Sequence, residues 1–127
     1  MKLLQIDIRK YLEERNWDKL RPSDISKSIC IEASELLEVF QWENLPLDEI
    51  KVNKNKIERV RSELADVLIF CLEMATLLEI DAEEIIREKL RKATEKYPPE
   101  KVRETNGKEP GTDEAYLAIK KTYRSQK

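Results

Sequence analysis

The sequence predicts an all-α fold, and both its composition and the spacing of its apolar residues support this class. Charged residues make up 39% of the 127 residues, aromatic residues make up 6%, and two positions are glycine. Such a composition favours helices over long sheets joined by tight turns. Apolar residues also recur at the spacing that places them on one face of an amphipathic helix. We therefore expect a four-helix bundle with a short C-terminal tail, in a chain of single-domain size.

The first two helices are expected on either side of Pro22. Leu4, Ile8, Tyr11 and Leu12 share one face of the first helix, which lies within residues 3–16. The second helix runs to about Trp42, and Ser23 or Asp24 is suited to cap its N-terminus. The apolar side chains expected to face the core from this second helix are Ile29, Ala33, Leu36, Leu37 and Phe40.

Two longer helices are expected after a polar connection at residues 44–55. Residues 56–79 have a continuous helical pattern whose core stripe is Leu64, Val67, Leu68, Cys71, Ala75 and Leu78. Asp81 is an acidic N-cap for a fourth helix, which the proline pair Pro98–Pro99 ends. The core stripe of this fourth helix is Ala82, Ile86, Leu90, Ala93 and Tyr97. The short link between the two helices predicts an antiparallel hairpin.

The chain is expected to divide into a functional domain at residues 1–98 and a tail at residues 99–127. The tail contains Gly107 and Gly111 and is expected to form a loop followed by a short helix at residues 113–124. The amphipathic helices are too few to close one core, which favours an oligomer.

Several classes of protein are disfavoured by what the sequence lacks. There is no apolar run of about 18 residues and no charged and then apolar leader, so we expect no membrane span, no signal peptide and a cytoplasmic location. Cys30 and Cys71 lie in apolar helical runs without CxxC spacing, and we expect both to be buried thiols. The chain has no histidine, so metal sites that need imidazole are excluded.

Two acidic pairs flank the apolar stripes of the second and third helices. Glu32 and Glu35 are three residues apart, as are Glu63 and Asp66. On an ideal helix Glu32 falls at the edge of its apolar stripe, whereas Glu35 lies further round. We therefore expect Glu32 to be half-buried.

Neither acidic pair has a basic neighbour in its own helix face. No Lys or Arg occurs at positions 28–50 or 62–86. Carboxylates at an apolar border without a local counter-ion need a cation from elsewhere. If the two helices pack face to face, four carboxylates converge, and carboxylate oxygens are the ligands that Mg²⁺ takes. The alternatives are that each pair is a solvated helix face, or that Arg59 pairs with Glu63 one helical turn away.

Basic and aromatic side chains supply the other candidate binding residues. Positions 87–108 hold eight bases against four acids, and Lys89, Lys92 and Lys96 form a stripe that either contacts phosphate or is a solvated border. Phe70 lies one turn beyond Asp66 and Trp42 about two turns beyond Glu35. Each of these aromatics either stacks on a nucleobase or belongs to the core or to an oligomer contact. Trp17, at a helix end, is typical of a packing anchor.

Three motifs follow one another along the chain. They are EASELLEVFQW at residues 32–42, ELADV at residues 63–67 and KLRKATEKYP at residues 89–98. Together they resemble the MazG-like nucleotide pyrophosphohydrolases and, within that family, the branch that includes dCTP pyrophosphatase. The resemblance covers residues 4–98, and the ordered set is far more specific than any one motif.

The resemblance implies an all-α, Mg²⁺-dependent enzyme that cleaves a nucleoside triphosphate to the monophosphate and pyrophosphate, with Mn²⁺ as a substitute metal. The implied partners are the nucleotide substrate and copies of the same chain in a homodimer or homotetramer, with no nucleic acid and no membrane. The expected role is house-cleaning of the nucleotide pool. The implied metal ligands are Glu32, Glu35, Glu63 and Asp66.

The resemblance also assigns roles to residues beyond the metal ligands. Trp42 and Trp17 would contact the base or shape its pocket, while Lys89, Lys92 and Lys96 would face the phosphates. Within this set Lys89 or Lys92 would screen the polyphosphate during catalysis, and Glu38 is a candidate to orient the attacking water. Arg21, Asp24 and Ala93 stand where the family often has His, Asn and Asn, so the base preference stays open. Two alternatives are a hydrolase of another pyrophosphate-containing nucleotide and a non-catalytic helical interaction protein.

Overall fold

The computed structural model describes residues 1–105 and 114–125. Seven helices and no strand occur in these residues, which confirms the all-α class. The chain forms two compact units, Met1–Glu83 and Glu84–Lys127. Within the described ranges, no helix combines the length and apolar character that crossing a membrane requires.

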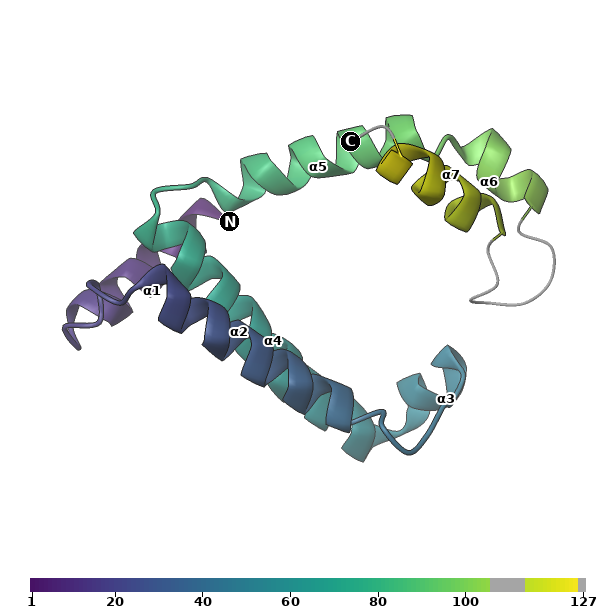
Figure 1. The fold of residues 1–127 in the computed structure, drawn as a ribbon. Coiled ribbons are helices and arrows are strands. Elements are labelled where there is room, and N and C mark those ends of the chain that lie inside the picture. Colours follow the sequence, from purple (N-terminus) through teal and green to yellow (C-terminus); the bar gives the residue numbers. More distant parts are fainter. Residues whose placement is uncertain (106–113, 126–127) are drawn as a thin grey trace. The chain divides into compact units, whose positions relative to one another are not determined.

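The first unit is built on a long antiparallel pair of helices. It contains α1 (Lys2–Glu13), α2 (Pro22–Glu38), α3 (Leu47–Val52) and α4 (Lys54–Leu77). Helix α2 lies alongside α4 in the opposite direction, and α1 packs near the C-terminal end of α4 (Figure 1). The helices expected near residues 3–16 and 56–79 are confirmed as α1 and α4, and the second expected helix is confirmed as α2, although it ends at Glu38 and not at about Trp42.

The expected cap of the second helix was wrong, and two short helices, α3 and α6, occur in stretches expected to be loops. Helix α2 begins at Pro22, with Arg21 in extended conformation as its N-cap, rather than at Ser23 or Asp24. Proline suits the first helical position because its fixed φ is helical and its missing N–H has no intrahelical role there. The same reason explains why Pro99 stands at the first position of α6, whereas Pro46 is the extended N-cap of α3.

The buried core of the first unit is small and lies where α1 crosses the end of α4. It comprises Ile8, Leu12, Leu72, Ala75 and Ala82, with Leu77 packed against it. The expected stripe of α4 is only partly buried, because Leu64, Leu68 and Leu78 are 43%, 52% and 47% exposed. In α2, Ile29, Leu36 and Phe40 are half-buried, whereas Ala33 and Leu37 are exposed.

Both cysteines are exposed, so the expectation of two buried thiols was wrong. Their position in apolar stretches is correct, but Cys30 on α2 and Cys71 on α4 lie on faces that the rest of the first unit leaves uncovered. Helical periodicity identifies an apolar face without identifying what packs on it. The exposed cysteines therefore mark uncovered faces of α2 and α4.

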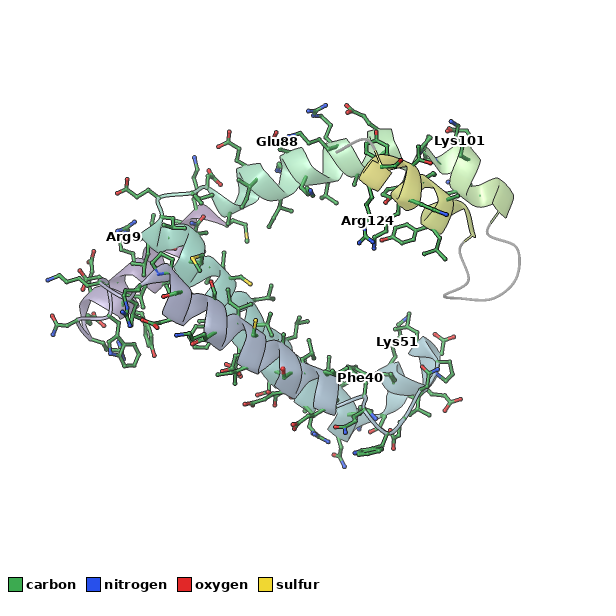
Figure 2. The ribbon with its side chains drawn as sticks, in the orientation of Figure 1. Arg9, Phe40, Lys51, Glu88, Lys101 and Arg124 are labelled. Atoms are coloured by element: carbon green, nitrogen blue, oxygen red, sulfur yellow. The ribbon has the colours of Figure 1, made fainter. Side chains whose placement is uncertain are left out.

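Polar contacts from α1 hold the end of α4 and the turn that follows it. The Gln5 side chain donates from Nε2 to the Ile80 carbonyl at 2.9 Å and accepts at Oε1 from the Ala82 N–H at 3.1 Å. Arg9 donates from Nη2 to the Thr76 carbonyl at 2.7 Å (Figure 2). Carbonyls in the last turn of a helix lack intrahelical partners, and a guanidinium there also opposes the negative end of the helix dipole. The α1 side chains thus stabilise the C-terminus of α4.

The turn after α4 contains a residue in an unfavourable backbone conformation. Glu79 has φ of 56°, and the Ile80 N–H donates to the Ala75 carbonyl at 2.8 Å. This is a Schellman motif, in which the left-handed position is usually glycine. A residue with a Cβ pays about 1–2 kcal/mol in that conformation. After this turn, Asp81 Oδ1 accepts from the Glu83 N–H at 3.0 Å, as expected of a capping acid.

Replacing Glu79 by glycine should stabilise the protein by about 1 kcal/mol, since relief of the left-handed strain exceeds the added entropy of the unfolded chain. Urea unfolding followed by circular dichroism measures the change. The matched control is Asn16→Gly, because Asn16 also has positive φ, at 58°, and asparagine tolerates that region well. Equal stabilisation by both variants would contradict the strain argument.

The second unit contains most of α5 (Ala82–Lys96) together with α6 (Pro99–Thr105) and α7 (Glu114–Ser125). Helix α5 confirms the fourth expected helix, and α7 confirms the short helix expected at residues 113–124. Tyr97 and Tyr116 stack with ring centroids 5.1 Å apart, and the Lys96 ammonium lies 4.3 Å from the Tyr123 ring centroid. The loop expected around Gly107 and Gly111 falls outside the described residues. The hairpin between the third and fourth expected helices stays a prediction, as does the domain boundary at residue 98.

Candidate functional site

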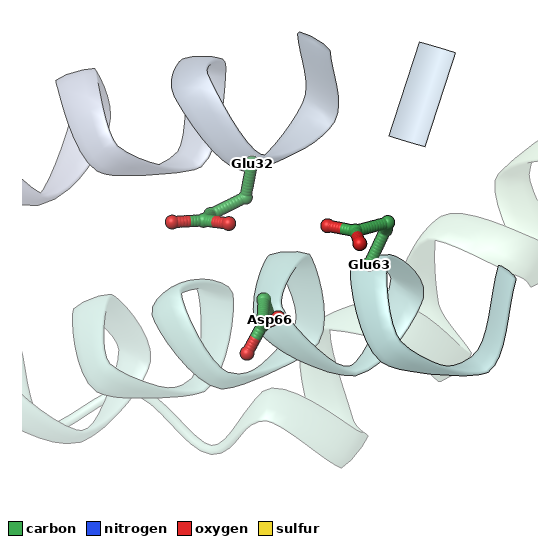
Figure 3. Close-up of side chains that lie close together, drawn as sticks. All are labelled: Glu32, Glu63 and Asp66. Carbon is green, nitrogen blue, oxygen red and sulfur yellow. The ribbon is translucent and has the colours of Figure 1, made fainter. Parts of the chain in front are cut away.

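Three carboxylates converge where α2 faces α4. Glu32, Glu63 and Asp66 each offer one oxygen, and these oxygens all lie within 4.8 Å of one another. Glu32 projects from α2 towards α4, which carries the other two (Figure 3). We call these three residues the acidic cluster.

The helical spacing of the chain explains why these side chains meet. Glu63 and Asp66 are three residues apart and therefore share a face of α4. Glu32 lies at the border of the apolar stripe that α2 packs against α4, and the structure confirms that it is half-buried. The antiparallel pairing of α2 and α4 thus brings acids from distant parts of the sequence to one place.

The acidic cluster has no compensating positive charge among the described residues. Its members form no ion pair there, and Arg59 does not pair with Glu63 as the alternative interpretation required. Loss of solvent raises the pKa of the Glu32 carboxyl, and the nearby charges of Glu35, Asp66 and Glu63 raise it further. Three half-buried like charges at this separation repel one another unless a proton or a cation lies among them.

The chemistry of the cluster fits a hard divalent cation. Three carboxylate oxygens are the donors that Mg²⁺ and Mn²⁺ prefer, whereas zinc and copper sites generally include imidazole or thiolate. A site with three protein ligands also leaves positions for water or phosphate oxygens, which Mg²⁺ sites commonly retain. Glu32, Glu63 and Asp66 can therefore hold such an ion together.

Three other residues proposed from the sequence lie outside the acidic cluster. Glu35 is exposed on α2, and its influence on the cluster is the charge it adds near Glu32. Glu38 is exposed at the last residue of α2. Trp42 lies in the turn after α2 and is 87% exposed. Their proposed roles in metal binding, catalysis and base contact stay predictions.

A groove of about 890 Å³ adjoins the acidic cluster, and Asp66 borders both. Trp17 and Phe70, which the sequence analysis singled out, line this groove. Tyr11 lines it too, and its ring meets that of Trp17 edge to face at 5.9 Å between centroids. The groove lies between α1 and α4, so aromatic side chains from two helices surround one apolar space.

Sequence reasoning missed Glu73, which also lines the groove. Its side chain is 4% exposed although it is an acid, and burial raises the pKa of its carboxyl. Asp66, Phe70 and Glu73 follow one another at i, i+4 and i+7, so they share a face of α4. That spacing is the signal by which Glu73 could have been found.

The lysine stripe belongs to the second unit. Lys89 is exposed, and Lys92 pairs with Glu88, whose carboxyl pKa the Lys92 hydrogen bond holds below its usual range. Lys96 is half-buried beside the rings of Tyr97 and Tyr123. The proposed contacts of these lysines with phosphate stay predictions.

Comparison with known proteins identifies the family. Residues 27–109 match the model of the MazG-like family, which is more than half of the chain. The chain therefore belongs to the MazG-like family. It is similar to the crystal structure of a pyrophosphatase from Archaeoglobus fulgidus DSM 4304, with 38% identity, a TM-score of 0.65, and coverage of 76% of this chain and 90% of that one. No curated protein matches the chain.

Mg²⁺ should stabilise the wild-type protein, and Asp66→Asn should abolish this effect. With free Mg²⁺ at about 100 times its Kd, linkage predicts about 2.7 kcal/mol of stabilisation, which a thermal melt detects readily. In chelator the variant should be at least as stable as the wild type, because one repelling charge is gone. The control is Glu13→Gln on α1, an exposed acid outside the acidic cluster, which should retain the Mg²⁺ shift. A shift that survives in Asp66→Asn would contradict this site.

The stability of the metal-free protein should depend on the charge state of Glu32. The pKa of Glu32 is raised in the folded state, so in the pH interval above the ordinary value of 4.5 the folded chain binds more protons than the unfolded chain. The extra proton binding by Glu32 stabilises the folded state at low pH, and this stabilisation is lost as pH rises through the raised pKa. Urea unfolding in chelator at about pH 5, 6 and 7 measures the free energy of unfolding. The value for Glu32→Gln should rise relative to the wild-type value as pH rises. A pH-independent difference would be inconsistent with the repulsion.

Proposed function

We propose that this protein is a Mg²⁺-dependent nucleoside triphosphate pyrophosphohydrolase, which converts (deoxy)nucleoside triphosphates to monophosphates and pyrophosphate. The observation that carries this proposal is a cluster of three carboxylates without a counter-ion in a MazG-like chain. The similarity to a pyrophosphatase supports a pyrophosphate bond as the bond that is hydrolysed. House-cleaning of the nucleotide pool in the cytoplasm is the proposed role.

In this proposal each part of the substrate has its own residues. Glu32, Glu63 and Asp66 hold the metal, with Glu35 as a further acid beside them. When bound, Mg²⁺ neutralises charge on the polyphosphate and lowers the pKa of a coordinated water. Mn²⁺ has similar ligand preferences and is the proposed substitute.

The remaining proposed residues act on the water and on the phosphates. Glu38 is the candidate to orient the attacking water through its carboxylate. Lys89 and Lys92 screen the charge of the polyphosphate, and Lys96 extends the same stripe by one further turn. Trp17, which lines the groove, and Trp42 are the residues proposed to contact the base or to shape its pocket.

Assembly into a homodimer or homotetramer is part of the proposal. The first unit leaves large apolar side chains exposed, including Leu37 and Leu68 at 66% and 52%. Exposed apolar surface of this kind often marks a protein interface. A second copy of the chain is the proposed cover for the uncovered faces of α2 and α4.

Pyrophosphate release from a panel of ribo- and deoxyribonucleoside triphosphates tests the proposed reaction. We expect monophosphate and pyrophosphate in equal amounts with Mg²⁺ and none with excess chelator. Asp66→Asn should lower kcat/KM by about a hundredfold or more, because a catalytic metal is worth several kcal/mol.

The matched control for this experiment is again Glu13→Gln, which should retain wild-type turnover. Turnover that is unaffected by chelator would exclude the metal mechanism. No hydrolysis of any triphosphate in the panel, together with a normal stabilisation by Mg²⁺ in the thermal melt, would instead favour another pyrophosphate-containing nucleotide as the substrate. No hydrolysis and no stabilisation by Mg²⁺ would favour a non-catalytic interaction protein.

A further inference from the structure

The groove between α1 and α4 is lined by an acid, Glu73, that has little exposed surface and pairs with no described residue. Glu73 is 4% exposed, and its carboxyl forms no hydrogen bond or ion pair within the described part of the chain. Among the described side chains only Thr76 has a fully buried polar atom without a partner, so the Glu73 oxygens still reach solvent, and a molecule that shields them has to replace that solvent with a hydrogen-bond donor. Because Glu73 lines the groove, a molecule bound there can supply the missing donor.

The charges that line the groove indicate which part of a nucleotide it suits. Its lining includes the carboxylates of Asp7, Asp66 and Glu73, and none of the described residues that line it is Lys or Arg. A polyphosphate would be repelled there. An uncharged, flat group with hydrogen-bond donors on its edge would instead be attracted. The nucleoside end of a substrate has this character.

The aromatic side chains of the groove can hold such a group by its faces. Trp17 is 46% exposed, and its ring contacts that of Tyr11 edge to face, while Phe70 on α4 is half-buried. Nucleobases stack on exposed aromatic rings of this kind. Stacking is tolerant of base identity, so selection among bases has to come from a polar group.

The position of the groove along α4 agrees with a nucleotide that reaches from the acidic cluster. Asp66 belongs to the cluster and also borders the groove. Glu73 lies seven residues further along the same face of α4, which is about 10 Å of helix. This is a span that a nucleoside can bridge, with its phosphates at the cluster and its base beside Glu73.

We propose that Glu73 is a specificity-determining residue that accepts a hydrogen bond from the exocyclic amino group of a nucleobase, and so selects cytosine and adenine nucleotides over uracil and thymine nucleotides. A carboxylate oxygen accepts from the amino group of cytosine. Uracil and thymine present a carbonyl oxygen at the same place, and two acceptors repel. This inference rests on the proposed function for its biological setting, although base binding can be measured without turnover.

The test is the binding of deoxynucleoside monophosphates to the full-length chain, measured by calorimetry with and without Glu73→Gln. The wild type should bind dCMP and dAMP about tenfold or more tightly than dUMP and dTMP, the value of one hydrogen bond to a charged acceptor. Glutamine has the same shape but offers both a donor and an acceptor, so it can pair with either kind of base. The preference should therefore fall to about twofold or less in Glu73→Gln.

Glu13→Gln is the matched control, because Glu13 is an exposed acid on α1 that does not line the groove. Its removal tests whether any loss of negative charge changes the selectivity. The ratio of dCMP to dUMP affinity should persist in this variant. A thermal melt of each variant establishes that the chain is folded.

The outcomes separate this inference from the proposed function. Selective binding of dCMP that Glu73→Gln abolishes supports the inference, even if no triphosphate is hydrolysed. Triphosphate hydrolysis with a dCTP to dUTP ratio that Glu73→Gln leaves unchanged overturns it and leaves the proposed function standing. Absence of monophosphate binding together with concentration-dependent self-association overturns it as well, because a second copy of the chain then occupies the groove.

Discussion

Repulsion among the three carboxylates of the acidic cluster is the constraint on which the arrangement of the first unit depends. The α2–α4 pair buries apolar residues along one seam, and the same seam forces Glu32 to face Glu63 and Asp66. Like charges that are partly removed from water destabilise the pairing. The helices therefore meet favourably along most of their length and unfavourably at one place. A cation at that place turns the least stable part of the seam into a link between the helices.

The contacts at the other end of α4 have the opposite character. Gln5 and Arg9 satisfy backbone groups around the last turn of α4, and the small buried core lies beside them. These neutral and charge-assisted hydrogen bonds need no ligand. At one end of the first unit, contacts within the chain thus hold α1 against α4. The acidic cluster, in contrast, needs a cation or a proton to relieve its repulsion. The groove opens between these two regions, so its walls are held by the stable end while Asp66 connects it to the cluster.

Much of this fold could be predicted from the sequence because helical periodicity is a local property. It located the helices α1, α2, α4 and α5, and it identified Glu32 as a half-buried acid before any contact was known. It could not predict which apolar faces are covered, and so Cys71 was expected inside and lies outside. Glu73 was missed for a related reason. A single acid within an apolar stretch carries no pattern of its own, and its isolation arises only when α1 packs across α4.

The position of Asp66 at the border of both the acidic cluster and the groove has a thermodynamic consequence. Any cation that neutralises this carboxylate changes the field that an occupant of the groove experiences. Coupling between two sites is reciprocal, so the occupant changes the affinity for the cation by the same factor. The Asp66 side chain would thereby couple occupancy of the acidic cluster to occupancy of the groove, so that binding at one place is measured as a change of affinity at the other.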